Sequence, residues 1–171
     1  MKKPLRNLSW LALAGLLLMA AVWQPGVLLI PPGAAGAPGL AFQNDADTGL
    51  WSSGANTLNF STGGSERARI DSAGHLESLG TAPSLGACGT SPSIVGTDVA
   101  GKVTVGGAGA GLTSCALTFA GLWTNAPACT GVNETQILFT KSVSTTTGLT
   151  FDTAATMATG NVIAYQCIGR R

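Results

Sequence analysis

The chain has 171 residues, which is enough for one ordinary domain or two small ones. Charged residues make up 10% of it and the formal net charge is +1, so a nucleic-acid-binding protein that relies on dense phosphate neutralisation is disfavoured. With 45% hydrophobic residues and 24 glycines, the composition fits neither a disordered chain nor a helical enzyme, because disorder needs charge and helices avoid glycine. It indicates a mainly β protein.

Residues 1–30 are predicted to form an apolar N-terminal helix. A basic cluster at residues 2–6 precedes an uncharged apolar run over residues 8–23, which is the layout of an export signal. Pro38 follows the small residues that a signal peptidase would need, and this makes cleavage there unfavourable. A signal peptide, a retained anchor or assembly helix, and a buried core helix all stay open as interpretations. Residues 8–30 would also allow contact with a membrane.

Glycine occupies every third position over residues 31–39, at Gly33, Gly36 and Gly39. Glycine at that period lets three polyproline strands approach one axis. The same composition is typical of a stiff linker. We therefore expect a Pro/Gly neck here, either as a plain linker or as a short three-stranded trimer neck.

Residues 40–80 contain short alternating runs separated by turn residues. Leu58 and Phe60 share a face of one predicted strand, and the pair of glycines at 63–64 predicts a hairpin loop to the next strand. In that next strand, Glu66 is expected on the same face as Ile70. So little apolar material cannot close a core alone, and the strands are expected to pack against other copies of the chain.

A separate β domain is predicted over residues 83–171, as an antiparallel β-sandwich. Residues 145–148 read as a hairpin tip, and the glycine-rich residues 106–111 read as a flexible loop between strands. Alternation predicts strands over residues 101–105, 114–119, 135–144, 148–151 and 161–168.

Two parts of the chain resemble a known family. Asp-Ala-Asp-Thr-Gly-Leu-Trp at 45–51 and Phe-Ser-Thr-Gly-Gly-Ser-Glu-Arg-Ala at 60–68 lie in a stretch, residues 38–74, that resembles the repeat segment of tailed-bacteriophage tail fibres and tail spikes. Short motifs such as Trp-Thr-Asn-Ala-Pro-Ala-Cys at 123–129 are similar to the carboxy-terminal domains of the same proteins. The resemblance implies a trimeric β-prism-like shaft in a homotrimer, other virion tail proteins as partners, and a tip that binds a host cell-surface glycan or protein.

All four cysteines, Cys88, Cys115, Cys129 and Cys167, lie in the predicted sandwich. In an extracellular particle an even count predicts two disulfides out of three possible connectivities. Reduced buried thiols and a metal site are the alternatives. Metal is disfavoured because no close Cys-x-x-Cys pair occurs.

The residues give little basis for catalysis. His75 is the only histidine, and no nucleophile-elbow motif accompanies it. The acidic residues of the sandwich, Asp98, Glu134 and Asp152, show no spacing that argues for a carboxylate pair. We predict a protein that is not an enzyme and that uses no cofactor and no metal.

Two further patterns are similar to those of ligand-binding sites. Residues 45–49 resemble the start of a calcium loop but lack its third acidic position and its closing glutamate, so a tight turn is expected. Trp123 and Asn125 are the receptor-binding candidates, because an indole ring can stack on a sugar face.

The resemblance, together with these patterns, implies a structural and adhesive component of a bacteriophage virion, located in the phage tail. It would be a short trimeric tail fibre or tail-tip protein that presents a receptor-binding β domain, since three weak sites on one axis multiply retention. The alternatives are a secreted or envelope-anchored bacterial adhesin, and a virion protein whose apolar N-terminus interacts with membrane during entry.

Overall fold

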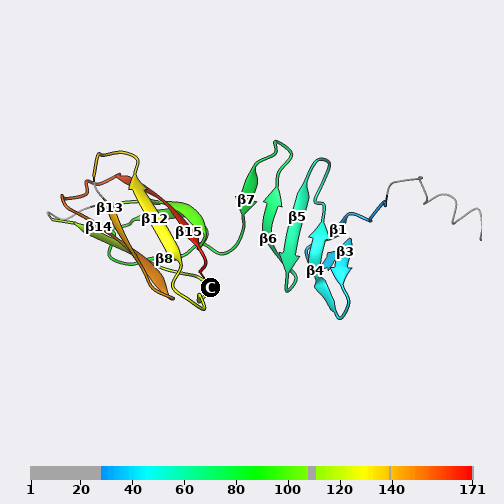
Figure 1. The fold of residues 1–171 in the computed structure, drawn as a ribbon. Helices are drawn as coiled ribbons and strands as arrows, with labels where there is room; N and C mark the ends of the chain where they lie inside the picture. The colour runs from blue at the N-terminus through cyan, green and yellow to red at the C-terminus, as the bar shows by residue number, and fades with distance from the viewer. Residues whose placement is uncertain (1–27, 108–110, 139, 171) are drawn as a thin grey trace, which may run out of the picture.

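The computed structural model describes residues 28–107, 111–138 and 140–170, and every regular element in these ranges is a β-strand. Figure 1 shows an open sheet toward the N-terminal end and a two-sheet body toward the C-terminus, joined by one connecting segment. The mainly β fold is therefore confirmed for the described residues. The predicted N-terminal helix falls almost wholly on residues outside these ranges. No described segment is a helix of the length and apolarity needed to cross a membrane.

The Pro/Gly segment forms a small β hairpin. β1 (Gly33–Ala34) pairs antiparallel with β2 (Ala37–Pro38), so that Gly33 lies opposite Pro38. Gly33 has a φ of 68°, and a Cβ there would overlap the backbone of Gly39. The chain thus reverses direction in this segment. A three-stranded neck at Gly33, Gly36 and Gly39 would require an extended conformation, which the single chain does not have here.

Five antiparallel strands in chain order form the open sheet: β3 (Leu40–Phe42), β4 (Asp45–Trp51), β5 (Leu58–Thr62), β6 (Ser65–Ile70) and β7 (Leu76–Ser78). The predicted hairpin loop is confirmed, with φ values of 57° at Gly63 and 70° at Gly64. Asn44, with a φ of 66°, makes the turn between β3 and β4. Asp45 and Asp47 consequently lie in strand β4, and the tight turn expected over residues 45–49 is wrong.

A β-bulge reorients one side chain of the sheet. Phe60 pairs with Ala68, but the next residue of β5, Ser61, pairs with Glu66, so Arg67 has no opposite residue. The extra residue shifts the alternation of β6 by one position. Glu66 therefore shares a face with Arg69, and the expectation that it shares a face with Ile70 is wrong.

Two four-stranded antiparallel sheets form the second body. One has the order β12-β15-β10-β9 and the other the order β13-β14-β11-β8. The strands are β8 (Ser84–Leu85), β9 (Ser93–Gly96), β10 (Ala100–Thr104), β11 (Ser114–Thr118), β12 (Ala128–Asn133), β13 (Thr140–Ser144), β14 (Gly148–Thr153) and β15 (Val162–Ile168).

Four of the five strands predicted in this body lie within two residues of the observed ones. The prediction over residues 135–144 is wrong in its first half, because residues 135–138 form a loop before β13. Strands β8, β9 and β12 were not predicted. The hairpin tip at 145–148 is confirmed by the hydrogen bond from Thr145 N to Gly148 O, 2.8 Å long. Of the glycine-rich loop, residues 108–110 lie outside the described ranges.

Inward side chains of both sheets share one core. Every second residue of the central strands is buried: Leu149 and Phe151 on β14, and Ile163 on β15. Phe151 reaches across to β12, where a Cβ on Gly131 would lie 2.5 Å from its ring. Glycine at 131 thus makes room for the largest fully buried side chain of the core.

Tyr165 lies at one border of this core. Its hydroxyl donates a hydrogen bond to the Thr97 carbonyl oxygen at 2.6 Å, and a Cβ on Gly101 would lie 2.7 Å from the same hydroxyl. Burial first, and then the negative charge of Asp98, raise the pKa of Tyr165 to about 12. The neutral phenol is therefore the form that the fold stabilises.

This shift predicts an alkaline limit to stability. The unfolded pKa of tyrosine is about 10, so the contribution of Tyr165 is complete below pH about 10 and is lost as the pH rises toward about 12. Tyr165 is the only tyrosine of the chain, so phenolate absorbance reports it alone. We expect a midpoint near 12 for the native chain and near 10 in denaturant. A native midpoint near the denatured value would contradict the burial of this hydroxyl.

Candidate functional site

One face of the five-stranded sheet carries apolar side chains that no other described segment covers. The strand register places Leu40, Leu50, Phe60 and Ala68 in one row across the sheet. Leu58, Ile70 and Leu76 form the next row. We call this surface the apolar face, and it consists of Leu40, Phe42, Leu50, Leu58, Phe60, Ala68, Ile70 and Leu76.

The apolar face is exposed well beyond the ordinary level for such residues. Leu76 is 75% exposed, Phe42 67% and Leu40 49%, while Leu58, Phe60 and Ile70 lie near 40%. Soluble monomers rarely expose contiguous apolar patches of this kind, and such patches mark sites of interaction.

Two hollows run along the apolar face. One has a volume of about 340 Å³ and is lined by Leu40, Phe42, Leu50 and Phe60. The other, of about 180 Å³, is lined by the same two leucines together with Leu58 and the chain at residues 30–32. The face is therefore ridged, and side chains from another surface have places to insert.

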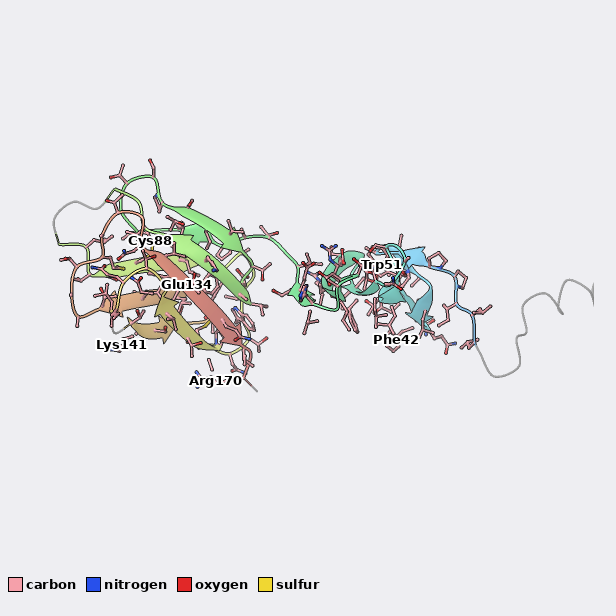
Figure 2. The ribbon with its side chains drawn as sticks, turned by 90° about the horizontal axis from the view of Figure 1, so that it is seen from above. Phe42, Trp51, Cys88, Glu134, Lys141 and Arg170 are labelled. Carbon is pink, nitrogen blue, oxygen red and sulfur yellow. A yellow bond between two sulfur atoms is a disulfide. The ribbon has the colours of Figure 1, made fainter. Side chains whose placement is uncertain are left out.

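On the opposite face of the sheet most polar side chains have partners, although the buried Nε1 of Trp51 has none among the described residues. Asn59 is fully buried there and donates a hydrogen bond from Nδ2 to Glu66 Oε1. Arg69 donates from Nε to Glu77 Oε2 at 2.6 Å and lies 3.8 Å from Glu66. Figure 2 shows Phe42 and Trp51 on opposite sides of the sheet. The polar side chains on this face are thus largely paired with one another, whereas the side chains of the apolar face have no such partners.

The four cysteines form two disulfides in the structure. Cys88, in the loop between β8 and β9, is bonded to Cys115 on β11. Cys129 on β12 is bonded to Cys167, its directly opposed residue on β15. No cysteine in the described ranges is free, so none is available as a thiol or as a metal ligand.

Trp123 and Asn125 lie in space beside the C-terminal residues 169 and 170, and both make contacts within the protein. The Trp123 ring meets Phe119 edge-on at 6.0 Å between centroids, and its Nε1 is buried without a hydrogen-bond partner among the described residues. Asn125 Nδ2 donates to the Arg170 carbonyl oxygen at 3.5 Å. The indole is half-buried against the core, which makes it a poor stacking platform for a sugar.

The acidic residues of the sandwich have separate partners. Asp98 accepts hydrogen bonds from Ala120 N at 2.8 Å and Gly121 N at 2.7 Å. Glu134 accepts one from Lys102 Nζ at 2.7 Å. Asp152 lies on β14 opposite Lys141 and Ser114. The three carboxylates therefore lie in three different places, each with its own neighbours.

The remaining titratable candidates form no site either. His75 Nδ1 lies 3.3 Å from Asp71 Oδ2 on the exposed surface. The hydrogen bond that the backbone N–H of His75 donates to Asp71 Oδ1 holds the pKa of Asp71 below its usual value. Within the described residues, no group of three or more His, Cys, Asp or Glu side chains is placed to hold a metal ion.

The packing of Trp123 makes a testable prediction. Replacing Trp123 by Ala should lower the free energy of unfolding by about 2–4 kcal/mol, because a large side chain leaves the border of the core. Asn125→Ala is the matched control and should change it by less than about 0.5 kcal/mol, because Asn125 is exposed. Urea denaturation of the full chain measures both. A Trp123→Ala chain of unchanged stability that no longer binds host cells would restore the sugar-stacking interpretation.

Comparisons with known proteins add no assignment to these surfaces: no protein-family model, curated protein or solved structure matches the chain.

Proposed function

We propose that the chain is a structural and adhesive component of a bacteriophage virion. It would be a short homotrimeric tail fibre or tail-tip protein, not an enzyme. The apolar faces of three copies would pack together into a β-prism shaft, and the sandwich would be the tip that meets a host cell-surface glycan or protein. The observation that carries this proposal is the exposed apolar face of the sheet β3–β7.

Hydrophobic burial supplies the driving force for the shaft. Complete burial of a leucine or phenylalanine side chain contributes about 1.5–3 kcal/mol relative to full exposure. Six large side chains of the apolar face are still between 38% and 75% exposed in the single chain, so about half of that contribution is unused. Three sheets with apolar faces turned inward would use it, and the partly exposed Arg69 and Glu77 of the opposite face would stay in contact with water.

The number three rests on the family resemblance. Residues 38–74 are similar to the repeats of tail-fibre shafts, and the structure of this segment, a narrow sheet of short strands with one apolar face, is suited to such a prism.

The sandwich suits a role outside the cell. Two disulfides in a body of this size are typical of proteins that function in an oxidising environment. Three tips on one axis bind a surface with avidity, because each bound tip holds the next close to its receptor. Other virion tail proteins would hold the opposite end of the fibre.

The proposal predicts the solution mass. Sedimentation of the full chain should give a trimer, and Phe60→Glu should give a monomer, because a carboxylate at the centre of the apolar face would be buried without a partner. Leu122→Glu is the matched control: Leu122 is 78% exposed, lies outside the sheet, and its variant should stay trimeric. A wild-type chain that sediments as a monomer would contradict the shaft.

A further inference from the structure

A second aliphatic surface lies on the outer side of the sheet β12-β15-β10-β9. One row across this sheet reads Val132, Ala164, Lys102 and Val95, in register from strand to strand. Val132 is 64% exposed and Val95 76%. Ile168, on the same side of β15 as Ala164, is 64% exposed. We call this surface the outer aliphatic face, and no other described segment covers it.

The outer aliphatic face is electrically neutral. Lys102 is the only charged residue within these four described strands. Its Nζ lies 2.7 Å from Oε2 of Glu134, which directly follows β12. The pair spans the central strand β15, where Ala164 and Val162 are small enough to leave room for it. Any surface that approaches this face meets no net charge.

The outer side of the other sheet is different in kind. Its rows contain Ser114, Asp152 and Lys141, then Ala116, Thr150 and Val143, and then Ser84 and Thr118 with Gly148. Most of these side chains offer hydrogen-bond donors, acceptors or charges to water. The outer aliphatic face also carries Thr130, Gln166, Thr104 and Ser93 in its neighbouring rows, but its strongly exposed large side chains, Val95, Val132 and Ile168, are aliphatic. The outer face of the other sheet carries charges instead, and neither face is covered in the single chain.

We propose that the outer aliphatic face packs against the same domain of two other copies, so that the tips of the trimer meet around its axis and the polar sheet faces outward. This inference rests on the proposed trimer. Three identical surfaces can meet only if like charges do not oppose one another, and the internal Lys102–Glu134 pair meets that condition.

The position of the aliphatic residues fits a three-fold arrangement. In a ring of three subunits, each contact joins two different patches, and every subunit carries both of them. Val132 lies on β12 at one edge of the sheet and Val95 lies on β9 at the other. The β12 edge of one tip can then contact the β9 edge of the next.

The connection to the shaft keeps the tips within reach of one another. Only residues 79–83 lie between β7 and β8, and a segment of that length spans at most roughly 18 Å. Tethers this short raise the effective concentration of one tip near another to the millimolar range, so a modest contact area is sufficient. A glycan receptor is a poorer occupant, because the face lacks an aromatic ring for stacking.

Carbene footprinting of the full chain tests the inference. The side chains at Val95 and Val132 should be labelled several-fold less in the wild-type trimer than in the Phe60→Glu monomer, as read by peptide mass spectrometry. Val143, which is 40% exposed on the outer side of the other sheet, should be labelled equally in both.

A charge variant tests whether Val95 is protected by direct contact between the tips. Val132→Glu brings a carboxylate into each of the three tip contacts, so Val95 labelling should rise to the level of the monomer while sedimentation still gives a trimer. Val143→Glu, the matched control, should leave Val95 labelling unchanged. Equal labelling of Val95 and Val132 in trimer and monomer would overturn this inference and leave the shaft intact. A wild-type monomer would overturn both.

Discussion

The sheet β3–β7 is one layer thick, and that constraint governs the rest of the molecule. A sheet is stable in water when its apolar face is covered by another layer. Here the hairpin β1–β2 and the polar ladder of Asn59, Arg69 and Glu77 complete one side only. The apolar face stays exposed in the single chain, and the proposal of an assembling fibre depends on that exposure.

The second body solves the same problem within a single chain. Its two sheets face each other across a core that includes Leu117, Phe151 and Ile163. The disulfide Cys88–Cys115 ties a loop to a core strand, and Cys129–Cys167 ties the edge strand β12 to the central strand β15. Cross-links of this kind stabilise a small domain by restricting its unfolded state. In the proposed fibre, the sandwich with its own core would be the tip, and the sheet β3–β7, which depends on other copies, would be the shaft.

Local sequence signals predicted much of this structure. Alternation located β10, β11, β14 and β15, and turn chemistry located the hairpins at Gly63-Gly64 and at residues 145–148. The face shared by Leu58 and Phe60 also followed from spacing, since one strand is enough to define it.

Features set by distant packing were not predictable in the same way. Strand β12 was missed because Gly131 weakens its pattern, and that glycine is explained only by Phe151 from another strand. The bulge that moves Glu66 beside Arg69 leaves no mark on local alternation. Three other features likewise depend on which strands become neighbours: the half-buried state of Trp123, the cysteine pairing, and the outer row from Val132 to Val95.

Thermal unfolding of the full chain over a wide range of protein concentrations tests the central claim most directly. If the apolar face is buried only between copies, folding of the sheet is coupled to association, and its melting temperature must rise with concentration. The melting temperature of the sandwich, which has its own core, should depend on concentration much less. A single cooperative transition at one temperature for all concentrations, from a chain that is monomeric throughout, would contradict the account.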